Sequence, residues 1–169
     1  DTTEEVLYPD RYKMTMKLPM GVIVQSLDGK SGWMSQGPQT QDLPPALVPE
    51  LAKGVTAAGG GLGFLLAAAT GKAEVIATGA DTAQWKQGDF EAKLTFDPAT
   101  HHLIKLSYKA LGMMGPAEQE TTFSEFQPID GLTLPTNEAT AQNGQPVGAR
   151  VISDRKINPG VKPEAFKKP

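Results

Sequence analysis

The sequence predicts an α+β fold in which one antiparallel sheet curls around a few short helices. Several segments alternate apolar and polar residues with the period of a half-buried strand. Tight-turn dipeptides such as Asp28-Gly29, Asp130-Gly131 and Asn143-Gly144 separate these segments. Sequence compatible with helices is confined to the middle of the chain. Strands joined by hairpins pair antiparallel, and no predicted helix is long enough to cover them all, so we expect the sheet to curl.

The N-terminal part of the chain predicts three strands. Residues 12–18 alternate, with Met14 and Met16 on the apolar face. A turn containing proline and glycine joins them to a partner strand over residues 22–27, and a shorter strand follows around residues 32–35.

Prolines interrupt the strand pattern after residue 36. Residues 46–53 follow two prolines and precede Gly54, which predicts a short helix. Residues 62–70 predict a second short helix that ends at Gly71. The glycine-rich segment before this helix favours a flexible hinge or lid, because glycine adopts many backbone conformations.

The second half of the chain returns to strands and hairpin turns. The predicted strands are residues 73–78, 90–96, 103–109, 120–126, 132–141 and 147–157. The final segment, "INPGVKPEAFKKP", predicts a strap that prolines keep out of the sheet, with Val161 and Phe166 as two apolar pegs.

Composition excludes several classes of protein. The 169 residues fit one domain with its own core, and the net charge of −3 with scattered basic residues does not suit nucleic acid. The absence of cysteine excludes disulfides and thiol chemistry but leaves the compartment open. The longest apolar run, residues 62–69, is far shorter than the roughly 20 residues that cross a bilayer. The start at Asp1, without a methionine or signal-like run, leads us to expect a processed or excised chain.

No motif for catalysis is present. His101 and His102 are adjacent in a predicted hairpin turn, where neighbouring side chains point in opposite directions, so solvated turn residues are favoured over metal ligands. The glycine-rich segment lacks the lysine and hydroxyl spacing of a phosphate-binding loop, and no serine lies in a GxSxG elbow. We therefore expect no catalytic residue, no metal, no cofactor and no enzyme activity.

The remaining candidate for function is apolar surface. The six methionines, Met113 and Met114 among them, and the aromatic residues could line a cavity, because thioether side chains repack around varied shapes. An ordinary closed core explains the same residues equally well. The candidates for cavity lining are Met14, Met16, Trp33, Phe64, Phe90, Phe96, Tyr108 and Phe123.

A series of short motifs spans most of the chain. It runs from Pro9-Asp10-Arg11-Tyr12 through Gly32-Trp33 to Phe123-Ser124-Glu125-Phe126 and "DGLTLP" at residues 130–135. In this order the motifs resemble the outer-membrane lipoprotein carrier superfamily, that of LolA, LolB and LppX. The closing strap also looks like the end of such domains, including LolA-like modules found downstream of pitrilysin-type zinc peptidase domains.

The resemblance covers residues 8–169 and implies a strongly curved, incomplete antiparallel β-barrel around an apolar cavity for acyl chains. On this basis residues 1–169 form a single LolA-like domain that lacks N-terminal elements or is excised from a longer chain. The implied function is a non-catalytic, extracytoplasmic module of the bacterial periplasm or cell envelope that binds a lipid, a lipoprotein acyl chain or another apolar ligand. A membrane-associated protein is an implied partner. The alternative is an accessory or interaction domain of a larger exported protein, for example beside a zinc peptidase domain, with a closed core and no ligand.

The resemblance also bears on the glycine-rich segment. In the periplasmic carrier an arginine just before the proline of the first motif fastens a helical lid, and the aligned position here is Tyr8. Arg11 lies two residues beyond that proline and does not take the same role, so the arginine latch does not carry over to this chain. The candidate lid hinge is formed by Gly59, Gly60, Gly61 and Gly63.

Overall fold

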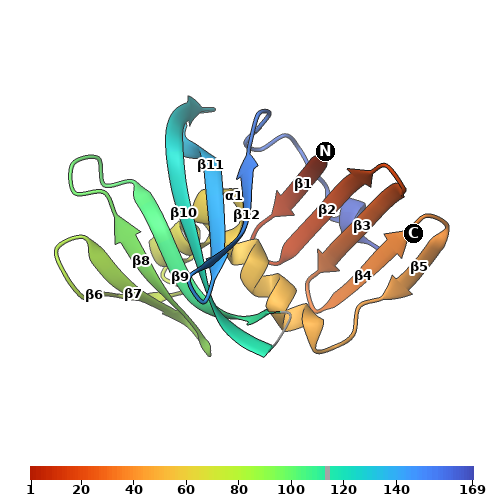
Figure 1. Ribbon diagram of the computed structural model, residues 1–169, viewed down its shortest axis with the longest axis horizontal. Helices are drawn as coiled ribbons and strands as arrows, with labels where there is room; N and C mark the ends of the chain where they lie inside the picture. The colour runs from red at the N-terminus through yellow and green to blue at the C-terminus, as the bar shows by residue number, and fades with distance from the viewer. Residues whose placement is uncertain (113–114) are drawn as a thin grey trace. The chain divides into compact units, whose positions relative to one another are not determined.

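The computed structural model describes residues 1–112 and 115–169, so Met113 and Met114 lie outside the described residues. Two open antiparallel sheets and one α-helix, α1 (Leu47–Ala69), form the structure (Figure 1). The chain divides into two compact units. Unit 1 contains residues 1–58 and 158–169, and unit 2 contains residues 59–157. The predicted α+β class with an open antiparallel architecture is confirmed, although its strands are divided between two sheets.

The sheet of unit 1 is a meander of five strands. Its strands, in spatial and chain order, are β1 (Thr2–Leu7), β2 (Arg11–Leu18), β3 (Gly21–Asp28), β4 (Ser31–Gln36) and β5 (Gln39–Asp42). The three predicted strands correspond to β2, β3 and β4. The edge strands β1 and β5 escaped prediction because they are short and mostly polar, so they lack the apolar alternation of a half-buried strand.

The two faces of this sheet are covered by different parts of unit 1. Tyr12 and Leu27 are partners in register and lie on one face, where they form a buried cluster with Val55 and Ala58 of α1. Ser26, the neighbour of Leu27, points to the opposite face because side chains alternate along a strand.

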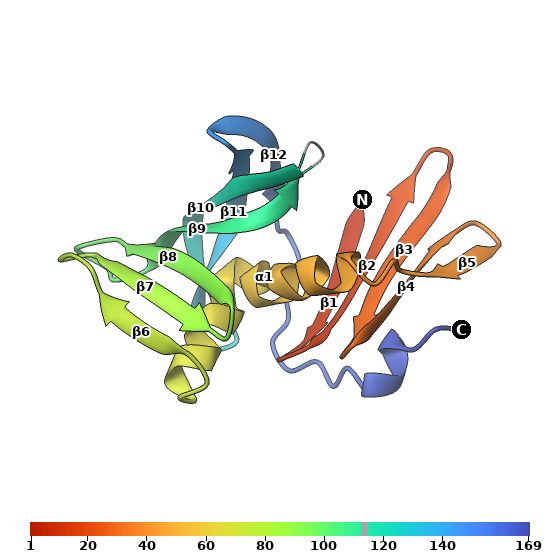
Figure 2. The same ribbon diagram turned by 90° about the horizontal axis from the view of Figure 1, so that it is seen from below.

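The C-terminal strap packs on that opposite face. It ends in a short 3-10 helix, η1 (Pro163–Phe166), beside β2 and β3 (Figure 2). Phe166 is fully buried, and its carbonyl oxygen accepts hydrogen bonds from Ser26 Oγ at 2.9 Å and Trp33 Nε1 at 2.8 Å. The prediction that Phe166 is an apolar peg is confirmed, and Val161 is partly buried.

The sheet of unit 2 is a second meander, of seven strands. In spatial and chain order they are β6 (Glu74–Ala77), β7 (Thr82–Gln87), β8 (Phe90–Phe96), β9 (Leu103–Gly112), β10 (Gly115–Ile129), β11 (Leu132–Gln142) and β12 (Gln145–Val151). Its core contains Phe64 of α1, with Trp85, Leu94 and Leu106 of the sheet, all of which are at most 1% exposed. The prediction omitted β7, whose alternation is limited to Ala83 and Trp85.

The two short helices predicted in the middle of the chain are wrong, because the structure has the single helix Leu47–Ala69 across the glycine-rich segment. Because glycine has low helix propensity, the sequence predicted that the first helix ends before Gly54. By length and mean hydropathy alone, α1 is one helix in the described part of the chain that could cross a membrane, contrary to the estimate from the longest apolar run. A core helix passes the same test, and Val55, Ala58 and Phe64 of α1 are buried.

The turn between β8 and β9 gives a testable dependence on pH. Asp97 Oδ1 accepts hydrogen bonds from Thr100 N at 2.7 Å, Thr100 Oγ1 at 2.9 Å and Ala99 N at 3.0 Å, and these bonds, those from Thr100 first, lower the pKa of Asp97. Because the folded pKa lies below the unfolded value, the stabilisation is complete above the unfolded value and is lost as the pH falls through the folded value. We expect Asp97→Asn to be less stable than the unmodified protein at neutral pH, and the difference to shrink as the pH falls below about 4. Urea unfolding midpoints of both proteins across this range measure the effect, and a difference independent of pH would contradict it.

Candidate ligand-binding site

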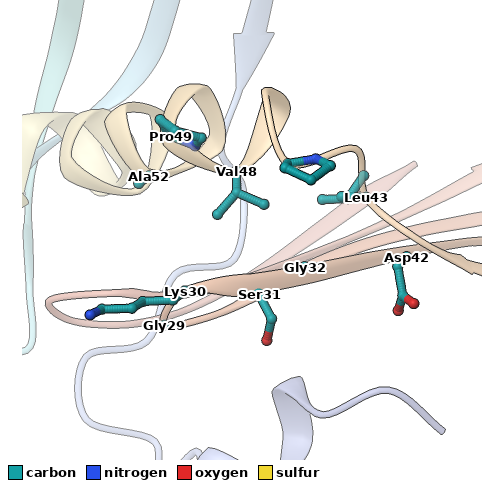
Figure 3. Close-up of a pocket in the computed structure, with 10 residues that line it drawn as sticks. Gly29, Lys30, Ser31, Gly32, Asp42, Leu43, Val48, Pro49 and Ala52 are labelled. Atoms are coloured by element: carbon teal, nitrogen blue, oxygen red, sulfur yellow. The ribbon is translucent and has the colours of Figure 1, made fainter.

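An open pocket of about 530 Å³ lies in unit 1, between the first turns of α1 and the turn that joins β3 to β4. Most of its lining surface is apolar. Figure 3 shows Val48 pointing from α1 toward the β3–β4 turn, while Ser31 and Asp42 point away from the helix. The lining residues are Gly29, Lys30, Ser31, Gly32, Asp42, Leu43, Pro45, Val48, Pro49 and Ala52.

The local sequence explains why this pocket has an apolar wall on both sides. Gly32 lies on the face of the sheet that carries Tyr12 and Leu27, and it leaves room for Leu43. A Cβ at Gly32 would lie 2.6 Å from Leu43 Cδ1, so the absence of a side chain lets buried Leu43 pack directly on β4. On the other wall, Val48 and Ala52 are one turn apart on α1 and so share a helix face.

The charged groups around the pocket are mostly paired. Arg11 Nε contacts Asp28 Oδ1 at 2.7 Å, and Arg11 Nη1 contacts Asp10 Oδ1 at 3.3 Å. Asp42 is 2.9 Å from Lys168 Nζ. Lys30 is exposed at the β3–β4 turn and takes part in no ion pair among the described residues.

Strand β2 carries Met14 and Met16, two of the predicted lining residues, on the face of the sheet that packs on α1. Met14 is partly buried and packs against the cluster of Tyr12, Leu27 and Val55. Met16 lies on the same face, two residues along β2, and is also partly buried. Trp33 of the predicted lining set lies on the opposite face, because its register partner is Ser26, and its Nε1 donates a hydrogen bond to the Phe166 carbonyl oxygen.

The other predicted lining residues belong to unit 2. Phe64, Phe90 and Tyr108 contact one another, with ring centroids 5.4 to 6.3 Å apart. Trp85 completes this aromatic cluster, with its ring centroid 4.7 Å from that of Phe64 and its Nε1 donating to Phe64 O at 3.1 Å. The prediction missed Trp85, although its alternation with Ala83 was the available signal.

Two further predicted lining residues lie elsewhere in unit 2. Phe123 is 2% exposed on β10, and Phe96 is half-buried at an irregularity between β8 and β9. The structure therefore brings together Phe64, Phe90 and Tyr108, and it separates Met14 and Met16 from Trp33 by the thickness of a sheet. Whether any of them contacts a ligand stays a prediction.

The candidate hinge has an unusual backbone. Gly59, Gly60 and Gly61 have φ values of 66°, 78° and 76°, in the left-handed region that favours glycine. A Cβ at Gly60 would lie 2.6 Å from Pro135 Cγ, and one at Gly61 would lie 2.6 Å from Leu103 Cδ2. Gly60 and Gly61 thus need glycine both for conformation and for close packing, and a hinge role for the segment stays a prediction.

Tyr8, at the position aligned with the carrier arginine, contacts the helix directly before this segment. Its hydroxyl donates a hydrogen bond of 2.9 Å to the carbonyl oxygen of Ala58. A neutral phenol therefore contacts the α1 backbone at the place where the resemblance implied an arginine.

The positions of the His, Asp and Glu side chains bear on whether the described part of the chain could hold a metal ion. Within residues 1–112 and 115–169, no group of three or more His, Asp or Glu side chains is arranged to hold a metal ion. His102 stacks on Phe126 with ring centroids 4.5 Å apart, while His101 is exposed with a φ of 58°. The histidine pair thus occupies a turn, as its sequence position indicated.

The open antiparallel sheets and the long helix α1 place the described part of the chain in the α+β class. A crystal structure of a LolA superfamily protein from Nitrosomonas europaea matches with a TM-score of 0.54, covering 99% of this chain and 86% of that chain at 14% sequence identity. This likeness shows the fold and confirms the architecture that the sequence motifs implied. No protein family model matches the chain, and no curated protein matches its sequence.

Proposed function

We propose that this chain is a non-catalytic, extracytoplasmic module that binds a lipid, a lipoprotein acyl chain or another apolar ligand. The observation that carries the proposal is the open apolar pocket of about 530 Å³ between α1 and the β3–β4 turn, in a chain with a LolA-like fold. Its volume lies within the range of roughly 300–1,000 Å³ that small-molecule sites occupy. The same proposal places the chain in the periplasm or cell envelope and gives it a membrane-associated protein as a partner.

The physical basis is the transfer of an acyl chain out of water. Each buried methylene contributes about 0.8 kcal/mol, so eight of them contribute about 6 kcal/mol before the cost of immobilising the ligand is subtracted. Leu43, Val48 and Ala52 supply apolar contacts for such a chain, and no covalent step is needed. Met14 and Met16 lie on the same face of the sheet and could repack as a longer chain enters.

Filling the pocket is expected to abolish most binding. We expect the purified protein to carry lipid detectable by mass spectrometry and to bind a fluorescent fatty-acid probe.

We expect Val48→Trp, which occupies the pocket, to weaken probe binding about tenfold or more, equivalent to about 1.4 kcal/mol. Fluorescence titration measures the affinity, and circular dichroism checks that the variant is folded.

The matched control is Val147→Trp, because Val147 is a valine that is 55% exposed on β12 in unit 2. We expect this variant to bind the probe like the unmodified protein. Absence of both co-purified lipid and probe binding in the unmodified protein would remove the proposal, as would equal effects of the two tryptophan variants.

A second candidate function is an accessory or interaction domain, for example beside a peptidase domain. The observation that favours it is the edge strand β12, which is exposed along its whole length and carries Val147 and Val151, the latter 77% exposed. Exposed edge strands pair readily with another chain. In this case we expect Val151→Lys to weaken association of this chain with its partner domain, measured by analytical ultracentrifugation. We also expect the purified protein to carry no lipid.

A further inference from the structure

Lys30 lines the apolar pocket and takes part in no ion pair within residues 1–112 and 115–169. It lies in the turn between β3 and β4, is exposed, and contributes to the lining. Figure 3 shows its side chain extending along the turn, on the side of the pocket away from Asp42. No other lining residue is basic.

The acidic groups nearby are engaged by other basic residues. Asp28, two residues before Lys30, contacts Arg11 Nε at 2.7 Å, and Asp10 contacts the same guanidinium at 3.3 Å. Asp42 is the one acidic lining residue, and it contacts Lys168 at 2.9 Å while pointing away from α1. Lys30 is therefore left with its ammonium available to a ligand.

From this arrangement we propose that the pocket takes a single-chain amphiphile with a carboxylate headgroup, a fatty acid, whose carboxylate pairs with Lys30. The inference rests on the proposed function and names the ligand class for the same site. An apolar wall takes the chain, and one ammonium without a partner balances one negative charge. A carboxylate fits because it carries a single charge and accepts hydrogen bonds from an ammonium group.

The contribution of Lys30 is one of specificity more than of affinity. Because Lys30 is exposed, its ion pair with a carboxylate is worth little in water, and we expect a fatty acid to bind only about two- to fivefold more tightly than the neutral alcohol of the same length. Added salt screens exposed charges, so this preference should decrease as the ionic strength rises.

The test compares three ligands of equal chain length in competition with a fluorescent fatty-acid probe at pH 8. These are a fatty acid, the corresponding fatty alcohol and the corresponding alkylammonium. We expect Lys30→Gln to weaken binding of the acid about two- to fivefold and to leave the alcohol unchanged. Lys30→Glu should weaken the acid further and strengthen the alkylammonium. Lys72→Gln, at another exposed lysine outside the pocket, is the matched control and should change none of the three affinities.

Several outcomes would overturn the inference. Equal affinities of acid and alcohol for the unmodified protein, or a parallel loss of both in Lys30→Gln, would show that Lys30 does not bind the headgroup while leaving the proposed function in place. A single-chain phosphate ester that binds more tightly than the fatty acid would overturn the carboxylate assignment. Failure of all ligands to bind would remove the proposed function itself.

Discussion

Gly61→Ala is expected to lower the free energy of unfolding by about 2–5 kcal/mol. Gly61 has a φ of 76°, where any residue other than glycine costs roughly 1–2 kcal/mol. In addition, a Cβ there would lie 2.6 Å from Leu103 Cδ2 and 3.1 Å from Leu106 Cδ2, and such overpacking of a core costs about 1–3 kcal/mol. Chemical denaturation monitored by tryptophan fluorescence measures the loss.

Two other glycines separate the two contributions. Gly71 also has a positive φ, of 68°, but a Cβ would meet nothing within 4 Å, so Gly71→Ala should cost only about 1–2 kcal/mol. Gly54 lies inside α1 without a positive φ and with open space, so Gly54→Ala should stabilise the protein by up to about 1 kcal/mol. If Gly61→Ala were no more destabilising than Gly71→Ala, close packing of α1 on β9 would not constrain this position.

The strands that could be predicted from the sequence are those with one buried face. β2 and β8 alternate cleanly because each has one apolar and one polar face, and the turns after them contain Pro, Gly or Asp. β1 and β5 are edge strands whose pairing depends on their neighbours more than on their own residues. The division of the strands into two sheets also depends on contacts between distant residues, which a local pattern does not contain.

The full length of the helix and the lining of the candidate site also depend on contacts that a local sequence pattern does not contain. The glycine run predicts a helix end. Glycine occurs there within α1 because the backbone has positive φ values and because the segment packs against Pro135, Leu103 and Leu106. The lining residues were chosen by type, since large apolar side chains suit both a cavity and a core. The observed pocket is instead lined by small and intermediate residues such as Gly32, Val48 and Ala52. No sequence signal distinguishes these positions, because a pocket forms where side chains are too small to fill the space.

The buried carboxylate of Glu138 in unit 2 could not be predicted from the sequence either. Glu138 is 4% exposed on β11, and its carboxylate lies 2.6 Å from Arg150 Nη2 and 3.6 Å from Arg155 Nη2. Arg150 is its register partner on β12, whereas Arg155 lies beyond the end of that strand. The alternation of β11 places Glu138 on the same face as Phe123, so an acid occurs at a core position only because arginines from β12 and the following segment neutralise it.

Phe166→Ala is the second substitution with a large expected effect, a loss of about 3–5 kcal/mol in the free energy of unfolding, the usual cost of removing a buried phenylalanine ring. The ring is fully buried, and the residue's carbonyl oxygen is the acceptor for both Ser26 Oγ and Trp33 Nε1. Loss of the ring would release the strap from the face of the sheet opposite α1 and deprive Trp33 Nε1 of its acceptor, which adds to the cost, whereas Ser26 Oγ keeps the Tyr12 carbonyl oxygen at 3.2 Å.

Two variants of neighbouring residues isolate the role of the ring. Trp33→Phe removes the indole donor together with part of a buried ring and should cost about 1–3 kcal/mol. Lys168→Ala removes an exposed ion pair with Asp42 and should cost at most about 1 kcal/mol. In the double variant Trp33→Phe with Phe166→Ala, the two losses should be less than additive, because release of the strap already breaks the bond from Trp33. Full additivity of the two losses would mean that the Phe166 ring does not hold the strap on the sheet. A loss below about 1 kcal/mol for Phe166→Ala alone would mean the same, because loss of a buried ring together with the hydrogen bonds to its carbonyl oxygen costs more than that.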